Sequence, residues 1–432
     1  MHNHLTSLFS RFFVSNSGNN GGAAAAAAAT AAEDGEGEPI EATTNAVGGE
    51  TASLEDHFIA LPYTLEAWKL MKKNDPKKTV CNLNGCDFLP SSAWKEMGET
   101  LGRNTRVHEL YAENCQLSEE SFTALMTGLK HNQSLKTLSF QNNPGLLQEI
   151  TMPILANHLQ TTYWKNNLVA LRLCRTNLSD RELRALLPGL NGTKIRQLSL
   201  NNNRIGVTTN RLSMKENLSY TFERLEMPEL EELSLVENEL GREGCEALQY
   251  LLRNENTRLK HVSLFRNDFD DGCCRILAEG LKDNSSLETM YIGSNDASER
   301  EPITSKGWEH FLRMVCDGSS IQRTYLSNHV IHDFGDVDSI RVRPTLAISS
   351  FIPLVIREIL KINASSVSSA RKGRRKVAKV HFNGEYNLEP LLQMKIKLMP
   401  HVIEFIGKEC SLQALHHFIR NTPALFDYYS LI

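Results

Sequence analysis

The chain contains 432 residues, of which 41% are hydrophobic and 23% are charged, and its formal net charge is −4. This length is enough for two or three domains, and the hydrophobic fraction is enough for a substantial buried core. The sequence has no run of 18 apolar residues, so no membrane-spanning helix is expected. The charge is unevenly distributed, because residues 341–432 carry 14 lysines and arginines against 6 acidic residues.

Two different segments precede the regular part of the chain. Residues 1–53 contain an alanine tract, paired glycines and the stretch EDGEGEP. They offer little large apolar surface to offset the entropy lost on ordering, so we predict disorder there. The lack of acidic residues before Glu33 leaves an organellar transit peptide open as an alternative. Residues 54–77, with apolar side chains such as Phe58 and Trp68, predict an N-terminal cap that covers the first repeat.

A frame of eleven residues recurs from Lys78 onward, with leucine-like residues at positions 1, 4, 6 and 11 and usually asparagine at position 9. LEELSLVENEL from Leu230 and LKHVSLFRNDF from Leu259 are clear copies. The other clear copies begin at Val107, Leu168 and Ile195, weaker copies begin at Leu135, Leu287 and Ile321, and the weakest of the nine begins at Lys78. Neither the helical nor the strand period explains this spacing alone. Apolar residues at helical spacing follow each frame, so each unit predicts a short strand and then an amphipathic helix.

This pattern resembles the leucine-rich repeats of the ribonuclease-inhibitor-like type, LxxLxLxxNxLxxxGxxxLxxxLxxN, over roughly residues 78–334. The resemblance implies an α/β solenoid, with a curved parallel sheet inside, helices outside and helical caps. A unit this short cannot bury its apolar side alone, so neighbouring units must stack.

Position 9 of the frame is expected to satisfy backbone groups in the turn that leaves each strand. Asparagine occupies it at Asn143, Asn203, Asn238, Asn267 and Asn295. Cys86 and Cys115 are alternatives that the repeat pattern permits, whereas Thr176 and His329 depart from it and leave their turns uncertain.

The repeats are assigned to residues 78–340, and residues 341–432 are predicted to form a helical C-terminal cap, with a partner-binding helix as the alternative. Within this segment, residues 365–380 are predicted to form an exposed basic loop flanked by serines and a glycine. Its basic residues are Arg371, Lys372, Arg374, Arg375, Lys376 and Lys379. A nuclear-import signal, a contact with an anionic surface and a solvated charge run all remain open. No aromatic residues alternate with these charges, so the loop does not indicate a specific nucleic-acid ligand.

The sequence lacks the common motifs of enzymatic chemistry. It contains no P-loop, no GxGxxG, no HExxH and no GxSxG. The adjacent His416 and His417 would point in different directions on a helix and make a poor metal site. The sequence therefore predicts a protein that is not an enzyme and holds no cofactor or metal. Nine cysteines without a CxxC pair favour reduced thiols, and hence the cytoplasm or the nucleus.

Side chains at positions 3, 5 and 7 of each frame should point away from the core, because positions 4 and 6 point into it. We call the surface that they line the concave face. Toward the C-terminal repeats, these positions hold His261, Phe265, Tyr291, Arg323 and Tyr325, and position 8 of one frame adds Arg266. Tyrosine and arginine often dominate the energetics of protein interfaces, so these residues predict a partner-binding site. Stacking that merely stabilises the sheet is the alternative.

The function predicted from these observations is a non-enzymatic scaffold that binds protein partners on the concave face. A resemblance to Ran GTPase-activating proteins, whose repeats are of this type, implies the alternative of activating a Ran-like small GTPase. The basic C-terminal segment departs from the acidic C-terminal region of that family.

Overall fold

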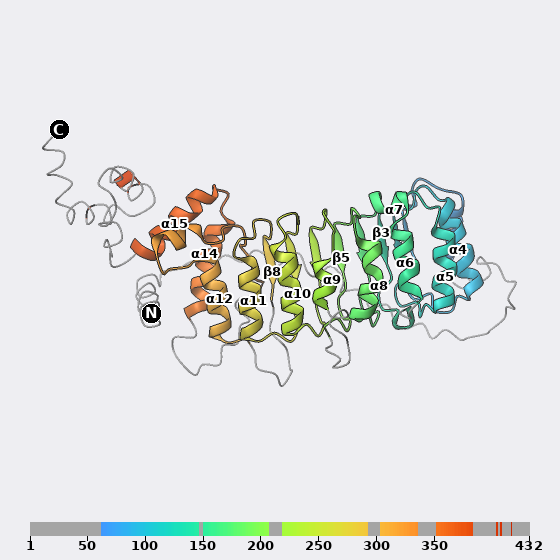
Figure 1. Cartoon of the computed structure of the whole chain (residues 1–432). Helices are drawn as coiled ribbons and strands as arrows, with labels where there is room; N and C mark the ends of the chain where they lie inside the picture. The colour runs from blue at the N-terminus through green and yellow to red at the C-terminus, as the bar shows by residue number, and fades with distance from the viewer. Residues whose placement is uncertain are drawn as a thin grey trace.

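The computed structural model describes residues 62–146, 150–206, 218–292, 303–335 and 351–382, together with residues 403, 404, 407 and 416. The predicted disordered segment, residues 1–53, lies outside the described residues. Eight parallel strands form one open sheet in sequence order, β1 to β8, and a row of helices lies along one side of it (Figure 1). The predicted α/β leucine-rich-repeat solenoid is confirmed.

Each strand has only three residues. The strands are Val80–Asn82 (β1), Glu109–Tyr111 (β2), Thr137–Ser139 (β3), Ala170–Arg172 (β4), Gln197–Ser199 (β5), Glu232–Ser234 (β6), His261–Ser263 (β7) and Thr289–Tyr291 (β8). The repeat helices are Ser91–Arg103 (α4), Glu119–Leu129 (α5), Thr151–Leu159 (α6), Asp180–Leu190 (α8), Leu218–Glu223 (α9), Arg242–Arg253 (α10), Asp271–Leu281 (α11) and Ser305–Val315 (α12). The remaining elements are Pro62–Lys72 (α3), Pro144–Leu146 (η1), Thr162–Asn167 (α7), Ile321–Leu326 (α13), Phe351–Ala364 (α14) and Ser369–Phe382 (α15).

The strands pair frame position to frame position, so the repeat alignment is correct for eight copies. Leu110 pairs with Leu138, and Leu198 pairs with Leu233, each at position 4 of its frame and each buried. Helices pack about 8–10 Å apart, whereas strands lie about 4.8 Å apart. Stacked units must therefore curve with the sheet on the inner side, which makes its open surface concave.

The asparagine at position 9 ties each turn to the preceding repeat. Asn143 Nδ2 donates to Ala112 O at 2.7 Å and to its own repeat at Phe140 O, while its Oδ1 accepts from Cys115 N and Leu117 N. The carboxamide thus satisfies backbone groups that have no partner in a three-residue strand.

The turn at Thr176 keeps the same form despite the substitution. The Thr176 hydroxyl donates to Leu173 O at 2.9 Å, and its backbone N–H donates to Asn203 Oδ1 at 3.0 Å. The threonine hydroxyl therefore makes the bond to its own repeat that the asparagine side chain makes elsewhere, and the backbone N–H still donates to the asparagine of the next repeat.

The strand predicted from Ile321 is wrong, because residues Ile321–Leu326 form α13. Ser320 caps this helix by accepting from Arg323 N at 3.2 Å. The ladder continues ten residues later, where Met290 N donates to Asp333 O at 3.0 Å and Asp333 forms an isolated bridge with Thr289. His329 is consequently not a turn residue of a frame.

A second set of asparagines lies where several of the helices end and the next frame begins. Asn132 Nδ2 donates to Leu101 O at 2.6 Å, and Asn284 Nδ2 donates to Leu252 O at 2.8 Å. Asn328 repeats this contact with Leu281 O at 2.9 Å, three residues before the buried Ile331. Asn363, in α14, donates to Ile331 O at 2.6 Å, so α14 occupies the place of the ninth repeat's helix.

The two ends of the solenoid differ in how much of them is described. At the N-terminal end, α3 carries the buried Trp68 and Met71, and Asn104 Nδ2 donates to Met71 O at 2.8 Å. At the C-terminal end, most of residues 383–432 lie outside the described residues. No helix in the described part is both long and apolar enough to cross a bilayer.

Glycines allow α4 and α5 to approach each other at backbone distance. A Cβ built on Gly128 would lie 2.2 Å from the backbone carbon of Gly98, and one built on Gly98 would lie 2.3 Å from Leu125 O. These contacts involve backbone atoms, which cannot move aside as a flexible side chain can.

We expect Gly128→Ala to lower the free energy of unfolding by about 1–3 kcal/mol, because the overpacking outweighs the gain in helix propensity. Gly280→Ala in α11 is the matched control, since its Cβ would first meet the Gln249 Cγ at 3.2 Å. Urea unfolding followed by circular dichroism measures both variants. Equal stabilities of the two variants would contradict the close backbone approach.

Candidate protein-binding surface

The concave face is lined as the strand alternation requires. In β6, Leu233 is buried, whereas Glu232 is exposed and Ser234 is half-buried. The repeat helices lie on the other side of the sheet (Figure 1). Most side chains at positions 3, 5 and 7 therefore reach the surface, whereas the small side chains of Ser139, Ala170, Cys174 and Thr289 are buried.

Two of the predicted site residues form a stacked pair at the C-terminal end of this face. The rings of Phe265 and Tyr291 have centroids 5.9 Å apart and planes inclined by 26°. Gly335 lies against both rings, because a Cβ there would come within 3.1 Å of each. Burial, and then nearby Asp333, raise the pKa of Tyr291. Beside the pair, His261 Nδ1 lies 2.8 Å from Thr289 Oγ1.

Arg266 lies at the edge of the concave face, next to this pair. It has a φ of 55°, and the same position of other frames is also left-handed: Gly85, Asn114, Asn142, Arg175, Asn202 and Glu237. The turn after each strand thus requires positive φ at position 8. The Arg266 side chain pairs with Glu237, which also accepts from Asn202.

Arg323 and Tyr325 do not lie on the concave face, which corrects the prediction for these two residues. Both lie on α13, an insertion between α12 and Asn328. Arg323 pairs with Asp317 at 3.6 Å, and Tyr325 packs against Gly373 of α15 while 37% of it stays exposed. The true ninth frame instead brings Asp333 and Gly335 beside Tyr291.

The predicted basic loop is a helix, α15, which packs on α13 and α14. Lys376 is fully buried, and its Nζ donates to Val315 O at 2.7 Å and to Asn328 O at 2.6 Å. Lys372 donates to His329 O at 3.3 Å, and Lys379 pairs with Glu358 at 2.9 Å. These three lysines therefore contact neighbouring elements; Arg371 and Arg374 are exposed, whereas Lys372, Arg375 and Lys379 are half-buried.

Sequence reasoning missed a second group of large side chains, on β2 and β4. Tyr111 donates to Glu109 Oε2 at 2.7 Å, and burial followed by this hydrogen bond raises its pKa. The charge of Arg172 and a hydrogen bond from its side chain lower the pKa of the same hydroxyl. Between this group and the Phe265–Tyr291 pair, position 5 holds only serines, at Ser199, Ser234 and Ser263. At position 5 the side chains between β4 and β8 are therefore small, and we call this row of three serines the serine floor.

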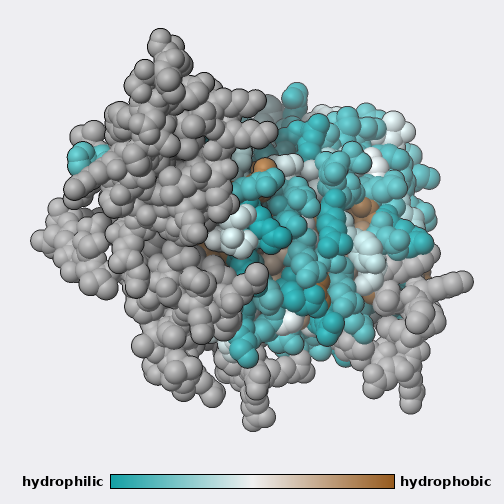
Figure 2. All heavy atoms as spheres, turned by 60° about the vertical axis from the view of Figure 1, so that its left-hand side comes forward, coloured by the Kyte–Doolittle hydropathy of each residue, from teal (hydrophilic) through white to brown (hydrophobic). Residues whose placement is uncertain are grey.

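Exposed apolar side chains do not form one large patch. The described surface in Figure 2 is mostly hydrophilic, with small separated hydrophobic areas. The large apolar side chains that are exposed in the described part are Phe88, Ile150, Val169, Tyr250, Tyr325 and Leu326, and of these only Tyr325 and Leu326 belong to the same element, α13.

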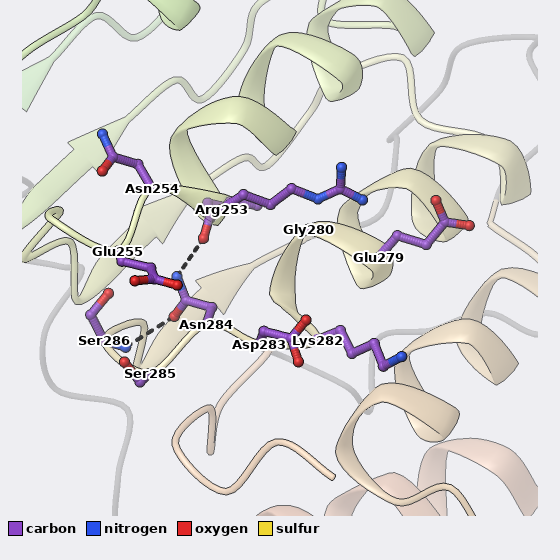
Figure 3. Close-up of a pocket in the computed structure, with 11 residues that line it drawn as sticks. Arg253, Asn254, Glu255, Glu279, Gly280, Lys282, Asp283, Asn284, Ser285 and Ser286 are labelled. Carbon is purple, nitrogen blue, oxygen red and sulfur yellow. Dashed lines mark hydrogen bonds between the residues drawn. The ribbon is translucent and has the colours of Figure 1, made fainter. Parts of the chain in front are cut away.

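A polar groove of about 500 Å³ lies where α10 and α11 end (Figure 3). Asn284 crosses its floor, donating to Leu252 O at 2.8 Å and accepting from Ser286 N at 3.1 Å. The rim mixes Arg253 and Lys282 with acidic residues. The groove is therefore part of the helix-end turn and shows no set of groups converging on a ligand.

The thiols are not arranged for chemistry. The eight described cysteines are buried and form no disulfide with one another. Burial raises the pKa of Cys81, Cys86 and Cys316 to about 12, which keeps them protonated. No group of three or more potential metal ligands occurs in the part of the chain that the structure describes.

Comparison with known proteins gives distant relatives. No family model matches the chain. It is 26% identical over 255 residues to the ribonuclease inhibitor of Mus musculus, covering 58% of this chain and 51% of that protein. The Sus scrofa ribonuclease inhibitor is 25% identical over 252 residues, with the same coverage. The mouse NACHT, LRR and PYD domains-containing protein 5 is 24% identical over 287 residues, covering 52% of this chain and 24% of that protein.

A solved structure of the leiomodin-1 actin-binding site 2 aligns with a TM-score of 0.22 and 17% identity, over 39% of this chain and 76% of that chain. That similarity is too weak to bear on fold or function. The chain spans about half the length of the ribonuclease inhibitors that it matches.

The repeat frame, the single parallel sheet and these relatives together define the class of protein. The chain is a leucine-rich-repeat protein of the ribonuclease-inhibitor-like type. Such relatives suggest a protein-binding role for its repeats.

Lys376 should make stability depend on pH. Burial lowers its pKa from 10.5 to about 7 in the folded chain. Between these pH values the unfolded chain binds a proton that the folded chain has released, so stability should rise with pH by up to about 1.4 kcal/mol per unit. Lys376→Met should abolish this component, whereas Lys361→Met, on the exposed side of α14, should keep it. Urea unfolding of the reduced protein at pH 7, 8 and 9 gives the change of unfolding free energy with pH. Equal pH dependences for the unaltered chain and both variants would refute the role of Lys376.

Proposed function

We propose that the chain is a non-enzymatic scaffold that binds a protein partner on its concave face. The observation that supports this most is the stacked Phe265–Tyr291 pair, which stands half-buried at the end of a floor of serines. Large aromatic side chains give much contact area with little loss of conformational entropy, which suits them to interface centres.

The competing interpretation is that the pair only stabilises the sheet. An aromatic pair contributes about 0.5–1.5 kcal/mol beyond its area burial. Truncation of an interface hot spot costs about 2 kcal/mol or more in binding. The two interpretations therefore predict different ratios between the loss of stability and the loss of affinity.

We expect Phe265→Ala and Tyr291→Ala each to weaken partner binding about 30-fold, equivalent to about 2 kcal/mol. The partner would be captured from the source cell with the full chain, identified by mass spectrometry, purified, and titrated against each variant. Tyr250→Ala on α10 is the matched control, since this tyrosine is 52% exposed on the helical side. Unchanged affinity in both variants, with a reduced melting temperature, would leave only the structural role.

The alternative, activation of a Ran-like GTPase, remains a prediction, and none of the described contacts favours it. Mixing the protein with a GTP-loaded Ran-like GTPase and following phosphate release tests it directly. We expect no acceleration. A faster release would replace the scaffold proposal.

We also propose that the protein works in a reducing compartment, the cytoplasm or the nucleus. The unpaired buried thiols support this proposal. The docked state of α15 counts against an import signal, because Lys376 and Lys379 are engaged within the fold.

A further inference from the structure

Arg172 stands among small side chains on the concave face. It occupies position 5 of β4, in register with Ser139 on β3 and Ser199 on β5. Along its own strand and turn, the next residues on this side are Ala170 and Cys174. None of these four side chains is long enough to cover a guanidinium group. The Tyr111 hydroxyl on β2 is a hydrogen-bond partner of Arg172, which is half-buried, but one such bond leaves most of the five N–H donors of the guanidinium group free.

Arginines elsewhere on the chain commonly pair with a carboxylate of a neighbouring repeat. Arg196 pairs with Glu231 at 3.7 Å and Arg258 pairs with Glu229 at 2.6 Å. Arg172 forms no such ion pair with the residues that the structure describes, and a neighbouring group on which it acts is the neutral hydroxyl of Tyr111.

The two acidic side chains near Arg172 are engaged with neutral donors. Glu109 and Arg172 both shift the pKa of Tyr111, and Glu113 and Arg172 both shift the pKa of Cys174. The two carboxylates therefore lie near Arg172. Glu113 Oε1 accepts from Ser139 Oγ at 2.6 Å and from Gln141 Nε2 at 2.7 Å. Glu109 accepts from Tyr111 at 2.7 Å.

We propose that Arg172 is the anchor for a carboxylate side chain, from an aspartate or glutamate of the protein that binds the concave face. The proposal rests on the scaffold function above and names the chemistry of its partner. A planar guanidinium can bind a carboxylate through two parallel hydrogen bonds. Glu109 and Glu113 disfavour a phosphate here, because its second negative charge would be repelled more strongly than a single carboxylate.

The sheet also fixes where the partner's carboxylate must lie relative to its apolar anchor. Arg172 on β4 and Tyr291 on β8 are four strand spacings apart, which is about 19 Å. The serine floor on β5, β6 and β7 lies between them. An extended segment of about six residues, or a helix of about thirteen, covers this distance.

The test uses peptides of random sequence, twelve residues long and displayed on phage, selected against the full chain. We expect the selected peptides to share an acidic residue and, separated from it, an apolar residue. Fluorescence anisotropy with the synthetic peptides should show at least a tenfold loss of affinity for Arg172→Ala and a smaller loss for Arg172→Lys. Arg196→Ala, in the next repeat, should bind as the unaltered chain does.

Charge reversal makes the test specific. Arg172→Glu should lose the acidic peptide and bind a peptide in which lysine or arginine replaces the acidic residue. Comparable losses for Arg172→Ala and Arg196→Ala, no shared acidic residue, or no selected peptide would overturn the proposal. So would tighter binding of a phosphoserine peptide than of its glutamate counterpart. Binding that is lost in Phe265→Ala but kept in Arg172→Ala would leave the scaffold function standing and remove this inference alone.

Discussion

The carboxamide of the frame asparagine is the contact on which the solenoid depends. A three-residue strand leaves the backbone groups of the following turn without ladder partners. An unsatisfied buried backbone group costs about 1–3 kcal/mol, and Asn267 alone bonds to Leu235 O and Leu264 O and accepts from Leu240 N. Because this side chain fixes where its turn begins, it also helps to fix which residues reach the concave face; at Thr176 a hydroxyl makes the bond to the same repeat. Sheet register and surface composition therefore follow from one position per repeat.

Much of this could be read from the sequence because the relevant contacts are local or lie one repeat away. Leucine spacing located β1 to β8, and the register of the pairs followed from it. The ninth frame failed because Ile321, Thr324 and Leu326 imitate the spacing while Ser320 begins a helix. A better signal was present at the helix ends, where Asn132 and Asn284 stand three residues before the next frame, as Asn328 does. The asparagine identifies the frame because it bonds to the backbone, whereas a leucine-like spacing can occur by chance.

The basic segment shows a different limit of sequence reasoning. Gly373, Val377 and Val380 lie on one helical face, but six cations within nine residues obscured that period. The acceptors for Lys376 are carbonyl groups 48 and 61 residues earlier in the chain. No local sequence pattern indicates a contact over this separation, so the burial of Lys376 could not be predicted from the sequence. The buried Lys376 amine donates to the carbonyl at the end of α12, an end of the helix that favours positive charge.

The same geometry explains why binding residues can vary without loss of the fold. Positions 4, 6 and 9 supply the packing and the turn, so positions 3, 5 and 7 carry few folding constraints. A serine floor leaves room for a partner to approach the sheet, and the backbone beneath it is already ordered before binding. Association then spends little of its free energy on ordering this side of the interface. Insertions such as α13 enter where helices end, outside the concave face, so they alter the rim and leave the floor between β4 and β8 intact.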